Sequence, residues 1–100
     1  MSANQILLEA IAHRKCVLAT YNRVAMKLAP HILYKRNDSV YVDAVAIEKA
    51  GQPPREFKLG TFNLAGLTDV TLADQHFEAV PLYDPAMPKY QGATLFAIAD

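Results

Sequence analysis

The 100-residue sequence predicts a mainly β domain, a small and strongly bent barrel of about five strands behind an N-terminal helix. Three observations predict this class. Apolar residues first recur at helical spacing, they alternate with period two after Lys15, and turn residues then divide the chain into short segments. We therefore expect a helix in residues 1–15, a barrel in residues 16–77 and a Pro-rich tail in residues 78–100 that wraps over the barrel.

The composition is that of one ordinary globular domain. Apolar residues make up 52% of the chain and charged residues 20%. No apolar run approaches the roughly 20 residues that cross a bilayer, and the N-terminus lacks the basic stretch of a secretory signal. We therefore expect a cytoplasmic protein that makes no membrane contact. Because the single Cys16 and three scattered histidines give no zinc pattern, we expect no metal and no cofactor.

The first segment has the pattern of a short amphipathic helix. Ser2 followed by Gln5 fits a capping box, with Ser2 as the N-cap. The expected apolar stripe comprises Leu7, Leu8, Ile11 and Ala12. A helix this short gains its stability by packing that stripe on another element.

The rest of the chain divides into strands. We expect them in residues 16–21, 24–36, 40–47, from near Arg55 onward, and around residues 70–72, with a last strand in residues 95–98 that fastens the tail. Both faces of the first strand are apolar, which predicts cover on both sides. Pro30 predicts an edge, a bulge or a bend. Apolar residues change parity between Phe57 and Phe62, which predicts a β-bulge at Gly60.

Charge is unevenly distributed, although the formal net charge is zero. No acidic residue lies between Glu9 and Asp38, a stretch that contains the bases Arg14, Lys15, Arg23, Lys27, Lys35 and Arg36. Two interpretations are open. The stretch forms a surface for an anionic partner, or the charges are solvated and neutralise one another in three dimensions.

No pattern of catalytic residues is present in the sequence. Glycines form no phosphate-binding loop, no serine lies in a nucleophile elbow, and Cys16 lies among apolar neighbours. We therefore expect a chain that is not an enzyme.

Several segments resemble the WYL domain, a small Sm-like β-barrel found in bacterial transcription regulators. Residues 17–21 (VLATY) are similar to the v-x-i-x-Y pattern that ends the family's first strand, and residues 28–33 (LAPHIL) to its v-x-P-x-x-L pattern. Residues 40–42 (VYV) keep the tyrosine of the Trp-Tyr-Leu motif after which the family is named, with valine at the other two positions. Residues 62–67 (FNLAGL) keep the apolar skeleton of the family's F-R-L-D-R-I motif but not its arginines and aspartate. We expect a stand-alone, divergent member without the family's helix-turn-helix, because only about fifteen residues precede the first strand.

The resemblance implies a non-catalytic sensor or regulatory module that binds a small anionic ligand, a nucleotide or single-stranded nucleic acid. The expected ligand-binding residues are Tyr21, His31, Tyr34, Lys35, Arg36, Tyr41, Arg55 and Lys58.

Each of these residues also has an interpretation without a ligand. Tyr21 either stacks on a base or belongs to the core, and His31 either contacts a phosphate or lies on a solvent-exposed rim. Tyr34 beside Lys35 pairs an aromatic ring with a cation. We place Tyr41 on the groove side, with the flanking valines inward, and Arg55 and Lys58 as replacements for the lost arginines.

A second function stays open at this point. The chain is alternatively a protein-interaction module that pairs with a protein partner, or with itself as a homodimer, through barrel edges or the helix.

Overall fold

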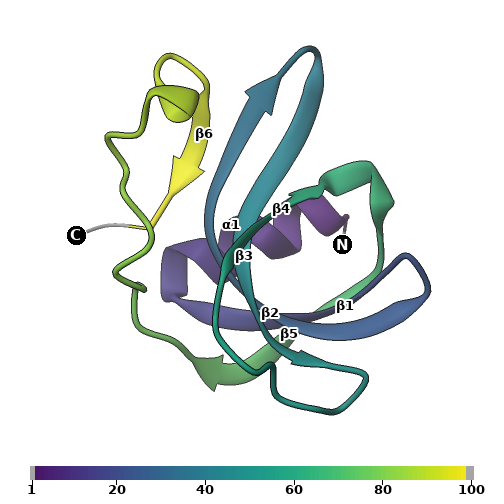
Figure 1. The fold of residues 1–100 in the computed structure, drawn as a ribbon. Helices are drawn as coiled ribbons and strands as arrows, with labels where there is room; N and C mark the ends of the chain where they lie inside the picture. Colours follow the sequence, from purple (N-terminus) through teal and green to yellow (C-terminus); the bar gives the residue numbers. More distant parts are fainter. Residues whose placement is uncertain (1, 99–100) are drawn as a thin grey trace.

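A computed structural model describes residues 2–98 (Figure 1). One helix, α1 (Ala3–His13), precedes six antiparallel strands in a single sheet. The strands are β1 (Lys15–Tyr21), β2 (Val24–Arg36), β3 (Ser39–Lys49), β4 (Leu59–Asn63), β5 (Leu67–His76) and β6 (Thr94–Ala97). Two short 3-10 turns, η1 (Leu64–Gly66) and η2 (Pro88–Tyr90), complete the fold.

The sheet order is β4-β3-β2-β1-β5, and β6 pairs with β2. The mainly β class with a leading helix is therefore confirmed. A closed barrel is not confirmed, because β4 and β5 end the sheet order and no ladder joins them within the described chain. The sheet is nevertheless strongly curved, as Figure 1 shows.

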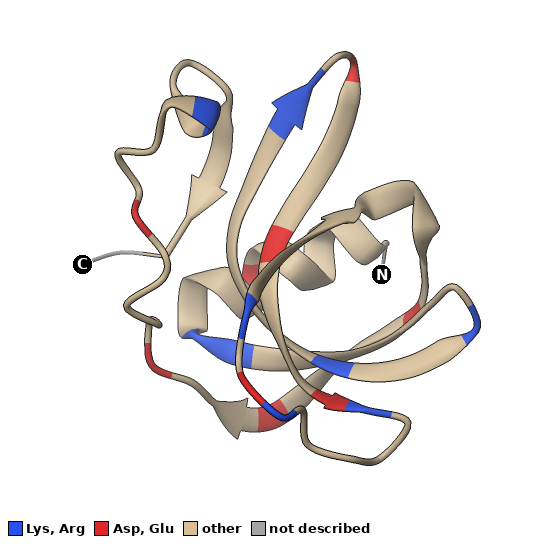
Figure 2. Cartoon of the chain, in the orientation of Figure 1, with Lys and Arg blue, Asp and Glu red and all other residues tan. Residues whose placement is uncertain are grey.

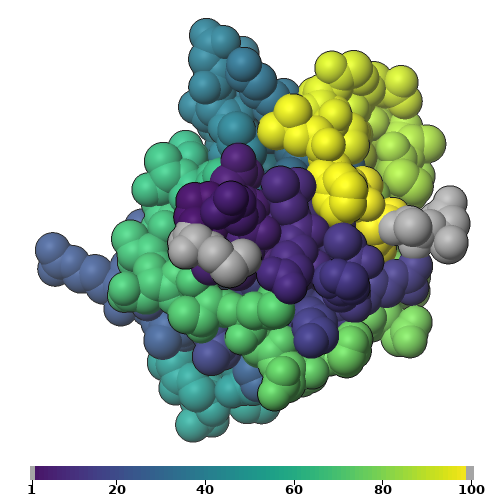
Figure 3. All heavy atoms as spheres, turned by 180° about the vertical axis from the view of Figure 1, so that it is seen from behind, coloured from purple at the N-terminus to yellow at the C-terminus, as the bar shows by residue number. Residues whose placement is uncertain are grey.

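Helix α1 begins at the predicted N-cap but ends at His13, before residue 15, where the sequence predicts its end. The Ser2 hydroxyl accepts a hydrogen bond from the Gln5 backbone N–H at 3.3 Å, and the Gln5 side chain accepts one from the Ser2 N–H at 3.1 Å. Arg14, in the left-handed conformation, ends the helix. The buried stripe differs from the expectation, because Ala10 joins Leu7 and Ile11 while Leu8 and Ala12 are exposed. Figure 3 shows the helix on the back of the molecule, between the tail and β5.

Two hairpins connect the first three strands. Residues Asn22 and Arg23 join β1 to β2, and Asn37 and Asp38 join β2 to β3. All four have positive φ, between 50° and 65°. Two-residue turns of this hand match the twist of the flanking strands, and asparagine tolerates the left-handed region better than most residues.

The predicted break at Pro30 is a β-bulge. Pro30 pairs with Ala44 and Ile32 pairs with Asp43, so His31 is an extra residue without a partner on β3. On its other side, β2 pairs first with β1 and, beyond the bulge, with β6. The predicted final strand is thus confirmed as β6; residues 99–100 of the expected tail lie outside the described residues.

Two expectations about β4 are wrong. The strand begins at Leu59 rather than near Arg55, and its pairing with β3 runs from Val45↔Leu59 to Tyr41↔Asn63 without a register shift. There is accordingly no bulge at Gly60. Phe57 lies outside the strand and is exposed. Its odd-numbered position therefore does not indicate which residues of β4 face the core.

The expected double cover of β1 holds only near its start. Val17 and Ala19 are buried in the main core, into which helix α1 also packs. On the opposite face, Cys16 is buried in a second cluster with Ala29 and Val45, but Leu18 is 44% exposed.

Candidate functional site

A buried carboxylate marks the most polar point of the interior. Asp43 lies in the middle of β3 and its side chain is only 1% exposed. Its Oδ1 accepts hydrogen bonds from the Tyr34 hydroxyl of β2 and the Thr61 hydroxyl of β4, each at 2.8 Å. Three adjacent strands therefore position this group, because Tyr34, Asp43 and Thr61 lie at nearby registers of the β2, β3 and β4 ladders.

The tail supplies the other two partners of this carboxylate. Lys89 places its ammonium 2.7 Å from Asp43 Oδ2, and the Tyr90 hydroxyl donates to the same oxygen at 2.5 Å. The Lys89 ammonium also lies 5.4 Å from the centre of the Tyr34 ring and 5.3 Å from that of Tyr90. We call these five residues, Tyr34, Asp43, Thr61, Lys89 and Tyr90, the Asp43 network.

The network keeps its carboxylate ionised. Burial alone would raise the pKa of Asp43, but the four bonds that the carboxylate accepts outweigh burial and hold this pKa below its ordinary value. Burial would likewise lower the pKa of Lys89, yet its bond to Asp43 raises it. The pKa of Tyr90 is raised by burial and then by the adjacent carboxylate. Asp43 and Lys89 therefore form an ion pair whose charge is neutralised inside the fold.

A small hollow opens beside the network. It has a volume of about 170 Å³ and is lined by Tyr34, Arg36, Asn37, Tyr41 and Thr61. The lining contains one cation and no carboxylate. Tyr41 packs on Tyr34, with ring centres 6.0 Å apart and planes inclined by 27°. We call this hollow the Arg36 hollow.

Three of the eight predicted ligand-binding residues meet here: Tyr34, Arg36 and Tyr41. Lys35 is the exposed neighbour of Arg36 at the end of β2. Tyr34 itself is fully buried and bonded to Asp43, so in this structure its ring is not open to a base. The partly exposed ring in the hollow is that of Tyr41, and Val42 faces the main core as expected.

The structure places the remaining four predicted residues elsewhere. Tyr21 packs edge-on against Phe62 at 5.1 Å and belongs to the main core. His31 lies neither on a rim nor in a groove but is completely buried, because the bulge turns it inward. Arg55 and Lys58 are exposed in the segment before β4, where Lys58 pairs with Glu56 at 3.6 Å.

The basic stretch does not gather at one place. Arg23 lies in the turn before β2, whereas Lys35 and Arg36 end that 13-residue strand (Figure 2). Between them, Lys27 pairs with Glu48 at 3.0 Å. Of the basic stretch, therefore, only the bases that end β2 lie at the Arg36 hollow.

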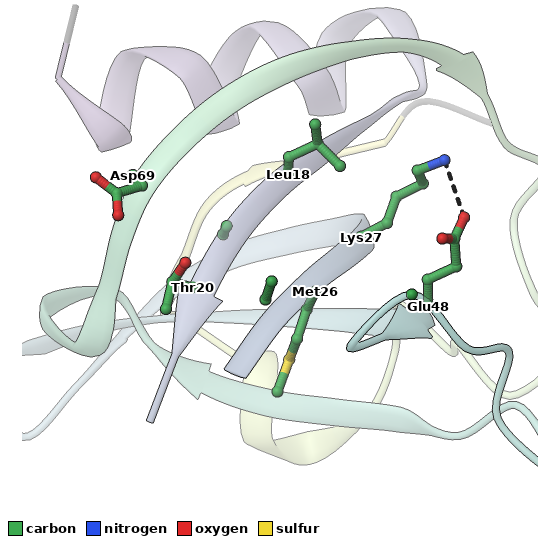
Figure 4. A pocket seen from close by; sticks show the side chains of 9 residues that line it. Leu18, Thr20, Met26, Lys27, Glu48 and Asp69 are labelled. Atoms are coloured by element: carbon green, nitrogen blue, oxygen red, sulfur yellow. Dashed lines mark ion pairs between the residues drawn. The ribbon is translucent and has the colours of Figure 1, made fainter. Parts of the chain in front are cut away.

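A larger hollow lies along β1 and the first half of β2 (Figure 4). It has a volume of about 230 Å³, and Leu18, Thr20 and Met26 contribute to its wall. Its charged residues are the Lys27–Glu48 pair and Asp69, which gives a net charge of −1. This wall is therefore unsuited to an anion.

Sequence reasoning missed Asp43, Thr61, Lys89 and Tyr90. One clue was available for the first of them, because Asp43 interrupts a strand that is otherwise apolar from Val40 to Ile47. A charged residue at such a position requires partners if it is buried. The sequence does not identify those partners, since Lys89 and Tyr90 lie more than forty residues away.

Comparison of the chain with protein families, curated proteins and solved structures found no match. Within residues 2–98, no group of three or more histidine, cysteine, aspartate or glutamate side chains could hold a metal ion. No helix in the same residues is long and apolar enough to cross a membrane.

Proposed function

We propose that this chain is a non-catalytic binding module that takes a small anionic ligand, or one phosphate of a single-stranded nucleic acid, into the Arg36 hollow. The observation that carries the proposal is the lining of that hollow. Arg36 and the partly exposed Tyr41 line the same space, and no aspartate or glutamate lines it. Arginine with an aromatic ring suits a phosphate attached to a planar base.

The size of the hollow limits what it accepts. Pockets that enclose whole drug-sized ligands measure roughly 300–1,000 Å³. At about 170 Å³, the Arg36 hollow accommodates one phosphate or one ring, and the rest of the ligand stays in solvent. We therefore expect weak binding with little sequence preference.

In this proposal the chain is a divergent WYL-like domain, and its bent sheet corresponds to the family's Sm-like barrel. The helix before an antiparallel sheet of order β4-β3-β2-β1-β5 supports that assignment at the level of architecture. The family's two lost arginines correspond to Asn63 and Gly66, and its lost aspartate to Ala65. In this proposal Arg36 takes over the role of the arginines in anion binding.

Titration with a fluorescently labelled oligothymidylate at two salt concentrations tests the proposal. Arg36→Ala should weaken binding and reduce the salt slope by about 0.7 for a single strand, as expected for one lost phosphate contact. Tyr41→Ala should cost roughly 1–3 kcal/mol of binding free energy while leaving the slope unchanged.

Arg23→Ala is the matched control, because Arg23 is also an exposed arginine at a hairpin but lies in the turn before β2, at the opposite end of that strand from Arg36. It should leave binding almost unchanged. An equal loss of affinity in Arg23→Ala and Arg36→Ala would show that binding comes from diffuse electrostatic attraction and not from the hollow. Absence of binding at low salt would exclude nucleic acid, and a parallel titration with inorganic phosphate or a nucleoside monophosphate would then test the small-ligand form.

A protein partner is the second candidate function, favoured by the exposure of apolar side chains on β6. Leu95 is 53% exposed and Phe96 is 37% exposed, and β6 pairs with only β2 among the described strands. Exposed strand edges of this kind invite pairing with another chain. Concentration-dependent self-association that Leu95→Lys abolishes would favour this function.

A further inference from the structure

The imidazole of His31 is hydrogen-bonded to the first part of the C-terminal tail. Its Nδ1 lies 2.8 Å from the Ala29 carbonyl oxygen, and its Nε2 lies 3.1 Å from the backbone nitrogen of Val80. A carbonyl oxygen only accepts and a backbone N–H only donates. The proton of the neutral ring is therefore on Nδ1, and Nε2 is the acceptor of the Val80 N–H.

The chain folds closely around this ring. The Phe77 ring centre lies 5.0 Å from that of His31, and the Tyr83 ring centre lies 5.3 Å away. The Phe77 N–H donates to the Arg14 carbonyl at 2.9 Å, and the Tyr83 N–H donates to the Val80 carbonyl at 3.0 Å. Residues 77–83 thus form a loop with the imidazole at its centre.

We propose that His31 is an acid-sensitive latch: protonation of its Nε2 detaches residues 78–83 from the sheet and uncovers Cys16. The protonated ring carries an N–H on both nitrogens. Its Nε2–H would then face the Val80 N–H, so the bond between them would be lost and two donors would oppose each other. The new positive charge would also be completely buried, a state that is costly without a partner.

Charged groups on neighbouring elements decide how strongly the ring resists protonation. Burial lowers the pKa of His31 most, the bond to Ala29 raises it, the charge of Arg14 lowers it, and that of Asp43 raises it. Arg14 reaches the site from the end of α1 and pairs with Glu78 at 3.9 Å. Asp43 is already bonded to Lys89, so it offers the imidazolium little compensation.

Detachment remains local because the tail has two further anchors. Lys89 and Tyr90 are bonded to Asp43, and β6 is paired with β2. Neither anchor involves the His31 side chain. Loss of the His31–Val80 bond therefore frees residues 78–83 only. Val80, which packs against the cluster that contains Cys16, then moves away from that cluster and leaves it less covered.

The single cysteine reports directly on this opening. The rate of its reaction with 4,4′-dithiodipyridine, which modifies thiols in acid, is divided at each pH by the rate for glutathione. Between about pH 7.5 and about pH 4.5, the range in which histidine titrates, we expect this ratio to rise at least about tenfold in the wild-type chain. Far-UV circular dichroism should stay native over the same range.

His31→Gln keeps an acceptor toward Val80 but does not titrate, so its ratio should stay flat with pH. His13→Gln and His76→Gln are matched controls at exposed positions and should respond like the wild type. A flat wild-type ratio would overturn the latch. So would an undiminished response in His31→Gln, or loss of the far-UV signal at the pH of thiol exposure, since unfolding would then be global.

If His31→Gln does not fold, nitrogen-15 spectra of the wild-type imidazole test the latch instead. At neutral pH the spectra should show Nε2 unprotonated, and the protonation midpoint should coincide with loss of hydrogen-exchange protection at Val80 but not at Ile98, whose N–H donates to the His31 carbonyl. An imidazolium that leaves Val80 protected would refute the latch.

Discussion

Replacing Asp43 with asparagine removes the negative charge from the Asp43 network while keeping the shape of the side chain. The remaining oxygen can still accept from Tyr34 and Thr61, as Oδ1 does. The new amide nitrogen, however, takes the place of Oδ2 and cannot accept from Lys89 or Tyr90.

The expected cost follows from those two lost bonds. A hydrogen bond to a charged group contributes about 1.5–3 kcal/mol, so two such bonds give about 3–6 kcal/mol. Lys89 is one-third exposed, and water compensates part of its loss. We therefore expect Asp43→Asn to lower the free energy of unfolding by about 3–5 kcal/mol, a large share of the about 5–15 kcal/mol typical of a domain. The midpoint of thermal unfolding should fall by at least about 12 °C.

Urea unfolding followed by far-UV circular dichroism measures this change. Asp38→Asn is the matched control, because Asp38 is exposed in a turn with a positive φ of 65° that asparagine adopts readily. Its effect should stay within about 0.5 kcal/mol. A cost below about 1 kcal/mol for Asp43→Asn would refute the network as a source of stability.

A double-mutant cycle separates the ion pair from the rest of the network. Lys89→Met removes the ammonium and leaves the carboxylate with three hydroxyl donors. Once Asp43 is asparagine, Lys89→Met should cost less than it does alone, with a coupling free energy of about 1–3 kcal/mol. Additive effects would show that the two charges do not interact in solution.

The remaining predictions concern the helix, one glycine and pH. Leu7→Ala empties a fully buried site under α1 and should lower the unfolding free energy by about 2–5 kcal/mol in urea; a change of a few tenths would mean that the helix does not dock. Gly66→Ala places a Cβ 2.9 Å from Cε1 of Tyr21 and should cost about 1–3 kcal/mol in the same assay, whereas a neutral effect would mean that the Tyr21 ring shifts freely. The pKa of His31 is lowered in the fold, so its contribution to the free energy of unfolding should be fully present above the unfolded pKa of 6.5 and decline as pH falls below it. Measuring the free energy of unfolding of the wild type and His31→Gln as the pH is lowered checks the sign of this effect.

Features that depend on near neighbours in the chain can be predicted from the sequence. The capping box at Ser2 and Gln5 was predicted, and the predicted strand ranges left Asn22 and Asn37 between strands. The structure shows the capping box and a turn at each asparagine. Their physical causes act within about four residues along the chain, so a single sequence contains the whole interaction. The period-two segments likewise predicted strands, and Pro30 predicted the irregularity in β2.

Which polar side chains are buried, and what they contact, depends on the tertiary structure. Asp43 meets Lys89 and Tyr90 across more than forty residues, and His31 accepts from Val80 across a sequence separation of 49. The bulge that turns His31 inward was foreseeable as an interruption, but the burial of its side chain depends on where the tail returns. Desolvation and partner choice arise only when distant strands assemble, because a charge is stabilised by the groups around it in space and not by its neighbours in sequence.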